Sequence, residues 1–353
     1  MTSKDINKMI RNATPSVHKV KLARYYNLAS ILGNDWALFY CIIGGRKTGK
    51  SYSITDFLCT QKRRLKNNVK NYWLRISETS TKALLANKAS KLIDPDLSRK
   101  YNLDLSTKGM EVFNHGEKFM EVIPLSQFAK LKGVGFFDKD FKGWYNLVLD
   151  EFQLELGERR TSFDILYNFI GMCENIVRTT KQKVRVFLVG NTLEEASTIL
   201  KAFNFLPEKF GRFYLKSKRC VIDNIEPTEE YLEDRKGSIA DILGGNEMSN
   251  YTNALTKDLK LLYKGRVIRP SGIIKFSKEL KDWFTIWDGI IIKRYNKEHL
   301  PLASDFCMIP HLNSYFSKER VQSIIDMYNA RALKFDTLIT QSYFTDAIKQ
   351  IIR

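Results

Sequence analysis

The chain has 353 residues, of which 44% are hydrophobic, enough to bury one large core or two moderate ones. Its 57 Lys and Arg residues outnumber 39 Asp and Glu residues, and the net charge of +18 favours a polyanionic partner, either a nucleic acid or an anionic membrane surface. The sequence contains no long apolar run, no apolar segment near the N-terminus and no CxxC pair among its five cysteines. These absences argue against a membrane span, a signal peptide, a disulfide framework and a zinc site, and we expect a soluble intracellular protein.

The first part of the chain alternates strand-like and helix-like segments. The apolar run 36–43 predicts a buried strand, and the sequence KSYSITDFLCTQKRRLK, which follows a glycine-rich turn, has helical character. Further strands are predicted at 72–76, 119–125, 144–150 and 184–191, and helices at 80–92 and 163–178. Because several of these strands are apolar on both faces, we predict an α/β fold with a parallel sheet covered by helices on both sides.

The composition changes after residue 206. Residues 207–245 are first basic and aromatic and then polar with a Gly-Gly break, which predicts a basic linker with helical pieces. From residue 246 onward short strands dominate, and two predicted helices at 318–328 and 336–352 close the chain. We therefore predict a large domain at 1–206, a linker at 207–245 and a smaller α+β domain at 246–353.

The turn after the first strand matches the phosphate-loop pattern G-x-x-x-x-G-K-[ST]. In this pattern glycines let backbone N–H groups face a bound polyphosphate, Lys50 reaches the β- and γ-phosphates, and Ser51 holds Mg²⁺. A chance turn would fit the same residues, but the strand before it and the helix after it favour a phosphate loop. We predict that ATP and Mg²⁺ bind at Gly44, Gly45, Arg46, Lys47, Thr48, Gly49, Lys50 and Ser51.

Two acidic residues lie at the end of the predicted strand at 144–150: Asp150 is its last residue, and Glu151 follows it. Asp150 would carry a carboxylate to the top of the sheet, where it can orient the water shell of Mg²⁺. Glu151 would polarise an attacking water, and this second carboxylate favours nucleotide hydrolysis over small-molecule phosphorylation. An acidic turn would explain the pair without chemistry, but the upstream phosphate loop supports the hydrolytic interpretation.

Asn191 and Arg178 are weaker candidates. Asn191 ends an apolar strand, where its amide can sense the γ-phosphate or hold the attacking water, although strands often end in Asn for reasons of turn geometry. Arg178 ends a predicted helix and could stabilise phosphoryl charge in a neighbouring subunit. A solvated arginine favoured by the helix dipole is the alternative for Arg178.

Several basic segments could follow a phosphate backbone, although a run of charges is usually a solvated face. Lys130 and Lys132 stand out because glycines at 133 and 135 follow them, as in a mobile loop. We group both lysines as candidate contacts to DNA or to another subunit.

Five sequence blocks carry a resemblance to one family. They are IIGGRKTGKS, VIPLSQFAKLKG, NLVLDEF, NIVRTTKQKVRVFLVGN and, near the C-terminus, RALKFDTLITQSYFTDAIKQIIR. Their order and approximate spacing resemble the DNA-packaging ATPase (encapsidation protein) of phi29-like phages over most of the chain. The likeness is strong in the N-terminal part and at the C-terminus, and weak between about 215 and 310.

The resemblance implies a P-loop NTPase of the ASCE type and a role for individual residues. It makes Asp150 the Mg²⁺-associated carboxylate, Glu151 the catalytic glutamate and Arg178 an arginine finger that acts in trans. Lys132 falls on a family lysine implicated in contacts between subunits. Arg75 falls on a family arginine after the second strand, and we group it with the candidate DNA or subunit contacts.

The resemblance also implies partners and a place of action. The expected assembly is a homomeric, pentameric ring at the portal of an empty capsid, where ATP hydrolysis threads double-stranded DNA through the pore. A packaging RNA is a further partner to consider, and no membrane is expected. The protein would then be found in the host cytoplasm and transiently at the portal vertex.

The C-terminal domain is expected to be RNase H-like, as in the wider terminase group, but reduced and without nuclease activity. It would contact DNA, the portal or a structural RNA. Two other functions stay open at this point. A replication helicase or another nucleic-acid-dependent ATPase would share the core and the charge, whereas a basic scaffold with a degenerate loop would bind DNA but not ATP.

Overall fold

The computed structural model describes residues 25–131, 138–152, 163–177, 182–191, 197–238, 242, 259–268, 270–274, 283–295 and 318–351. The chain forms two compact units. The larger unit comprises Met1–Phe203 and Lys209–Thr256, and the smaller unit comprises Asn204–Glu208 and Lys257–Arg353. The two units are described separately.

The larger unit is built on a nine-stranded sheet with the order β3-β4-β5-β2-β6-β7-β1-β9-β8. The strands from β5 to β9 in this order pair in parallel, whereas β3, β4 and β8 are antiparallel to their neighbours. The strands are β1 (Phe39–Ile43), β2 (Val69–Arg75), β3 (Leu105–Lys108), β4 (Glu111–Asn114), β5 (Glu117–Pro124), β6 (Trp144–Asp150), β7 (Lys183–Gly190), β8 (Gly211–Leu215) and β9 (Cys220–Asn224).

The central strands are mostly buried because helices cover the sheet. In β1 and β6 every residue except the first is buried. β7 lies between β1 and β6, and all three run in the same direction. Their carboxyl ends therefore meet at one edge of the sheet, which is where parallel α/β sheets place their ligands.

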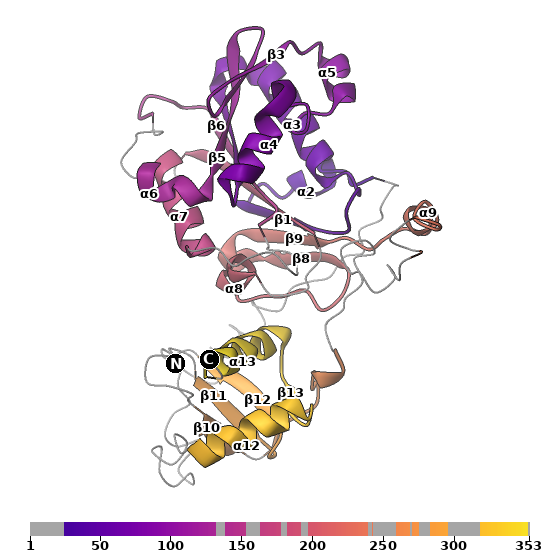
Figure 1. The fold of residues 1–353 in the computed structure, drawn as a ribbon, viewed down its shortest axis with the longest axis vertical. Helices are drawn as coiled ribbons and strands as arrows, with labels where there is room; N and C mark the ends of the chain where they lie inside the picture. The colour runs from indigo at the N-terminus through magenta and orange to yellow at the C-terminus, as the bar shows by residue number, and fades with distance from the viewer. Residues whose placement is uncertain are drawn as a thin grey trace. The chain divides into compact units, whose positions relative to one another are not determined.

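Helices α3, α4 and α5 lie together against one side of the sheet (Figure 1). Ile54 and Leu58 of α3 belong to the same buried cluster as Tyr40 and Ile42 of β1, which are alternate residues and so point to one face. The α-helices in the described part of this unit are α2 (Ala29–Leu32), α3 (Lys50–Leu65), α4 (Glu78–Ala89), α5 (Pro95–Tyr101), α6 (Phe128–Leu131), α7 (Ile165–Ile176), α8 (Thr198–Ala202) and α9 (Glu229–Glu233).

Within the described residues, the smaller unit contains a four-stranded sheet with the order β10-β11-β12-β13 and two α-helices. Phe344 of α13 packs on the sheet, with its ring centroid 5.1 Å from that of Phe284 and 5.4 Å from that of Phe335. The elements are β10 (Pro270–Ile274), β11 (Trp283–Trp287), β12 (Ile291–Tyr295), α12 (Lys318–Asn329), β13 (Lys334–Phe335) and α13 (Leu338–Ile351). The RNase H-like assignment of this part stays a prediction.

The predicted α/β fold with a mostly parallel, helix-flanked sheet is confirmed. The prediction of a linker at 207–245 differs from the structure, because β8 and β9 lie in this segment and extend the sheet. Its charges suggested a solvated segment, but Arg212 of β8 is buried and binds Asp223 of β9, with 2.6 Å between Nε and Oδ1. A charge that is paired across two neighbouring strands does not prevent them from joining a sheet.

Candidate active site

The loop between β1 and α3 is the phosphate loop predicted from the sequence, and two of its glycines, Gly44 and Gly49, occupy positions that disfavour a side chain. Gly49 precedes the first turn of α3 with φ 80°, a left-handed conformation that a Cβ atom disfavours. A Cβ atom at Gly44 would lie 3.0 Å from Ile225 Cβ, which is tighter than an ordinary contact, so a side chain there would require Ile225 to move. The N–H groups at the start of α3, a helix of 16 residues, have no partner within the helix and create a favourable site for an anion.

Lys50, the first residue of α3, is folded over this loop. Its Nζ atom donates hydrogen bonds to the carbonyl oxygens of Gly44 at 2.9 Å and Gly45 at 2.7 Å. The residue is 6% exposed, and burial lowers the pKa of Lys50 to about 8 although Asp150 and Glu151 favour its charged form. Phosphate oxygens could replace the two carbonyl oxygens and would bind the ammonium group more strongly, because they carry negative charge.

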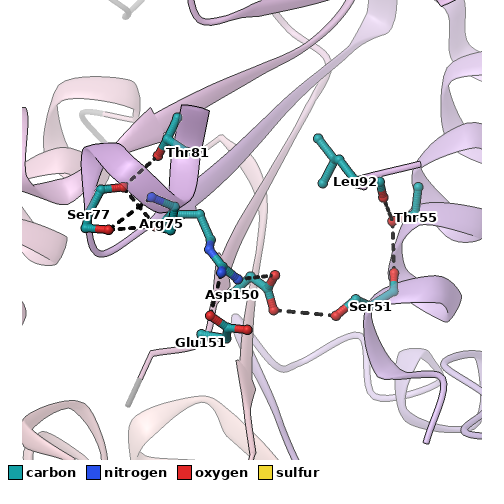
Figure 2. Close-up of polar contacts among 9 residues, drawn as sticks. Ser51, Thr55, Arg75, Ser77, Thr81, Leu92, Asp150 and Glu151 are labelled. Carbon is teal, nitrogen blue, oxygen red and sulfur yellow. Dashed lines mark hydrogen bonds and ion pairs between the residues drawn. The ribbon is translucent and has the colours of Figure 1, made fainter. Parts of the chain in front are cut away.

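Asp150 and Glu151 share one guanidinium group (Figure 2). Nη1 of Arg75 donates to Oδ2 of Asp150 at 2.8 Å, and Nη2 of Arg75 donates to Oε2 of Glu151. Consecutive residues of a strand normally point to opposite faces. Glu151 has φ 55°, and this left-handed turn at the end of β6 brings both carboxylates to the same arginine.

The two carboxylates differ in exposure. The side chain of Asp150 is 10% exposed and that of Glu151 is 52% exposed. Burial raises the pKa of Asp150, and the nearby cations Arg75 and Lys50 oppose this rise. Asp150 is therefore held inside the site, whereas Glu151 is open to water.

Ser51 and Asp150 could hold the Mg²⁺ ion predicted from the sequence. The hydroxyl oxygen of Ser51 lies 3.5 Å from Oδ1 of Asp150, the carboxylate oxygen that Arg75 does not bind (Figure 2). Hydroxyl and carboxylate oxygens suit Mg²⁺, which binds few protein ligands and keeps several water molecules. In the described part of the chain no group of three or more His, Cys, Asp or Glu residues could hold a metal ion, so an all-protein cage is not found there.

The loop between β1 and α3, the two acidic residues Asp150 and Glu151, and the end of β7 line one cavity of about 370 Å³ at the carboxyl edge of the sheet. Residues predicted from three separate sequence segments therefore come together: the phosphate loop, the acidic pair after β6, and Asn191 after β7. The lining residues are Arg46, Lys47, Thr48, Gly49, Lys50, Ser51, Tyr52, Asp150, Glu151, Val189, Gly190 and Asn191.

The structure places Arg75 beside the acidic pair of the candidate site, whereas the sequence grouped it with surface contacts. The sequence groups it with contacts to DNA or to another subunit, but its side chain is 11% exposed and binds the two carboxylates of the site. A signal was available in the sequence, because Arg75 lies next to the end of the predicted strand 72–76, as Asp150 ends the predicted strand 144–150. Lys130 is exposed on α6 and does not line the cavity. Lys132 and Arg178 lie outside the described residues.

A comparison with protein-family models and one with curated protein sequences found no match. Among solved structures, the viral genome packaging motor assembly of bacteriophage phi-29 matches over 93% of this chain and 100% of that chain, with 17% sequence identity and a TM-score of 0.62. The phi-28 gp11 DNA packaging motor matches over 92% of this chain and 98% of that chain, with 16% identity and a TM-score of 0.58. The resemblance stated from the sequence is confirmed at the level of the fold: the chain is similar along its length to phage DNA-packaging motors.

Proposed function

We propose that the protein is an ATP-driven motor that moves double-stranded DNA into a preformed viral capsid. The observation that carries this proposal is the single cavity that joins Lys50 and Ser51 of the phosphate loop with Asp150 and Glu151. The likeness of the whole chain to the phi-29 and phi-28 packaging motors supports the choice of DNA packaging among the many processes that ATP hydrolysis drives.

The loop residues would bind the triphosphate. The N-terminus of α3 and Lys50 provide positive charge toward the phosphates, and Lys50 would exchange its bonds to Gly44 and Gly45 for bonds to phosphate oxygens. Ser51 and Asp150 would hold Mg²⁺, which neutralises charge on the β- and γ-phosphates.

Glu151 is the residue suited to activate water. It is the more exposed of the two carboxylates, and it lines the same cavity as the phosphate loop. As a general base it would orient the attacking water and accept a proton from it. Asn191, at the end of β7, is placed in the same cavity to hold that water or to contact the γ-phosphate.

Movement of DNA requires that hydrolysis changes contacts between subunits. We assign Arg178 as an arginine finger that acts in trans within a homomeric ring, because it follows α7 in a block that resembles the packaging ATPases. The net charge of +18 suits a pore that holds the DNA backbone without reading its sequence.

The same proposal includes the partners that the resemblance implies. These are the portal of the procapsid, the other subunits of a pentameric ring and, as a further partner, a packaging RNA. The site of action would be the host cytoplasm and, during packaging, the portal vertex. The smaller unit, which we propose to be RNase H-like and without nuclease activity, would contact DNA, the portal or the RNA.

The first test is steady-state ATP hydrolysis by the purified protein, with and without double-stranded DNA, across a range of protein concentrations. Stimulation by DNA with a steeper than linear dependence on protein concentration would support a motor that assembles, and packaging into procapsids would then test the biological role. No hydrolysis under any of these conditions, or with added procapsids, would contradict the proposal. Strand displacement without a capsid would instead favour the helicase alternative.

A further inference from the structure

Two carbonyl groups of the phosphate loop are bound by tyrosines that lie outside the loop. The hydroxyl of Tyr231, in α9, donates a hydrogen bond of 2.6 Å to the carbonyl oxygen of Arg46. The backbone N–H of Tyr26 donates a hydrogen bond of 2.8 Å to the carbonyl oxygen of Thr48. The bound carbonyl groups belong to alternate residues, so the backbone of the loop is held at two points by segments far from it in the chain.

The residue after each of these carbonyl groups has a left-handed backbone. Lys47 has φ 63° and Gly49 has φ 80°. Glycine adopts this conformation readily, but Lys47 carries a Cβ atom, which disfavours it. The backbone of Lys47 therefore depends on contacts that hold it, and the bond from Tyr231 acts on the peptide unit directly before it.

A bond to a carbonyl group also sets the direction of the next N–H group. In a planar trans peptide unit, the C=O of one residue and the N–H of the next point in opposite directions. The bond from Tyr231 to Arg46 therefore turns the N–H of Lys47 away from Tyr231. Lys47 lines both the active-site cavity and a second cavity of about 250 Å³, whereas Tyr231 lines only the second of these two.

We propose that Tyr231 is a positioning residue whose hydroxyl directs the N–H of Lys47 toward the phosphates of a bound nucleotide. Successive backbone N–H groups beside a left-handed residue form a concavity that binds anions, and Tyr231 fixes one peptide unit of that concavity. This inference rests on the proposed nucleotide binding, to which it adds a residue outside the phosphate loop.

Tyr231 is itself held in place. The residue is 7% exposed, and its backbone N–H donates at 3.1 Å to Oγ1 of Thr228, the N-cap of α9. The guanidinium of Arg235 lies over its ring, 5.6 Å from the centroid. Burial raises the pKa of Tyr231, although Arg235 opposes this rise, so the hydroxyl keeps its proton at neutral pH and stays a donor.

The simpler alternative is that the hydroxyl of Tyr231 only attaches α9 to the rest of the larger unit. That role predicts a loss of stability with unchanged affinity for phosphates. The positioning role predicts a loss of affinity, because without the hydrogen bond the Arg46–Lys47 peptide unit can rotate, release the left-handed backbone of Lys47 and turn its N–H out of the site.

The test is the Tyr231→Phe variant of the full chain, which lacks the hydroxyl and keeps the ring. Isothermal titration calorimetry in the presence of Mg²⁺ measures the Kd values of ADP and of inorganic pyrophosphate. We expect both Kd values to rise about tenfold and by the same factor, because the lost N–H contact is to the part that the two ligands share. At saturating ATP and DNA, kcat should stay within about threefold of the wild-type value, because the groups proposed for the chemical step are not displaced.

Tyr40→Phe is the matched control. Tyr40 is 2% exposed, and its hydroxyl also donates to a backbone carbonyl group, that of Asn34, at 3.1 Å. It is the second residue of β1, and the phosphate loop follows the other end of that strand. Tyr40→Phe should therefore lower the free energy of unfolding, measured by urea titration, but keep both Kd values within about twofold of wild type.

Thr228→Val is a second test that keeps every atom of Tyr231. It removes the hydroxyl that holds the backbone of Tyr231, so it loosens the same contact less directly. We expect both Kd values to rise by about threefold, between wild type and Tyr231→Phe. If Tyr231→Phe did not fold, unchanged Kd values in Thr228→Val would by themselves refute the inference.

The remaining outcomes are distinct. If Tyr231→Phe leaves both Kd values unchanged, or raises them no more than Tyr40→Phe does, the inference is refuted while the proposed function stands. If the Kd of ADP rises and that of pyrophosphate does not, Tyr231 acts on another part of the nucleotide, and the inference is wrong. If kcat falls at unchanged Kd, the hydroxyl acts in the chemical step instead. If neither ligand binds the wild-type protein, the proposed function fails together with the inference.

Discussion

Arg75 and Asp150 form a buried ion pair between the ends of two adjacent strands. Their atoms Nη1 and Oδ2 are 2.8 Å apart, and the side chains are 11% and 10% exposed. The pair forms because β2 and β6 run in parallel with Leu74 opposite Leu149, so the next residue of each strand lies at the same edge of the sheet. The same arginine binds Glu151, and it thus connects both acidic residues of the candidate site.

Removing Arg75 should destabilise the protein in a way that depends on pH. Arg75→Ala leaves the carboxylate of Asp150 buried without its main partner, a change that typically costs about 3–5 kcal/mol. Burial already raises the pKa of Asp150 in the folded state, and loss of Arg75 raises it further. A carboxyl group whose pKa is raised in the folded state lowers stability fully above that pKa; the loss shrinks as pH falls below it and is gone below the pKa of the unfolded chain.

The measurement for Arg75→Ala is the free energy of unfolding from urea titrations at pH 7.5 and pH 5. The difference between wild type and variant should be smaller at pH 5, where more of Asp150 is protonated. Adding Asp150→Asn to the variant should remove this dependence on pH. If the difference in unfolding free energy between wild type and variant were the same at both pH values, Arg75 would have no effect on the pKa of Asp150.

Glu151→Gln should separate nucleotide binding from hydrolysis. The amide keeps the size of the side chain but cannot accept a proton from water, so we expect kcat to fall by about 10²–10⁴ with unchanged affinity for ATP. Binding by calorimetry and phosphate release at saturating ATP measure the two quantities. Glu117→Gln, a change of an exposed glutamate on β5, serves as the matched control and should keep full activity. Normal turnover in Glu151→Gln would remove Glu151 from the mechanism.

Nucleotide affinity should fall at alkaline pH because of Lys50. Burial lowers the pKa of Lys50 to about 8 in the free protein, and bound phosphates would raise it again. Above pH 8 the lysine must therefore take up a proton when a nucleotide binds, so the Kd for ADP should increase as pH rises, by at most tenfold per pH unit. Titrations at pH 7, 8 and 9 in buffers of different ionisation enthalpy would detect the proton uptake. In Lys50→Arg the side chain stays charged, and a dependence on pH that persisted in this variant would point to another group.

Mixed rings should reveal whether Arg178 acts in trans. Arg178→Ala subunits retain their own phosphate loop, and Lys50→Ala subunits retain Arg178, so each can supply what the other lacks only across a subunit boundary. We expect ATPase activity to change nonlinearly with the mixing ratio of the two variants, measured at constant total protein and saturating DNA. Activity that follows the mean of the two separate variants at every ratio would argue against trans action.

By itself the sequence predicted the α/β class, which the structure confirms, and most of the residues that the candidate site brings together. The apolar runs at β1, β6 and β7 are long enough and uniform enough to indicate buried parallel strands. The glycines and Lys50 of the phosphate loop have a fixed spacing because they lie on one short turn, and Asp150-Glu151 directly ends a strand. The residues of each of these patterns lie close together in the chain, so the patterns can be recognised in the sequence alone.

Only the tertiary structure decided the order of the strands and the contacts between distant segments. The position of β2 beside β6 brings Arg75 to the carboxylates, and this pairing depends on how the whole sheet buries its apolar faces rather than on any local spacing. The burial of Arg212 against Asp223 likewise turns a segment that seemed a basic linker into β8 and β9. In the same way, Tyr25 and α9 line one cavity although they lie more than half the chain apart, because Tyr26 donates to the carbonyl oxygen of Thr48 and Tyr231 donates to that of Arg46.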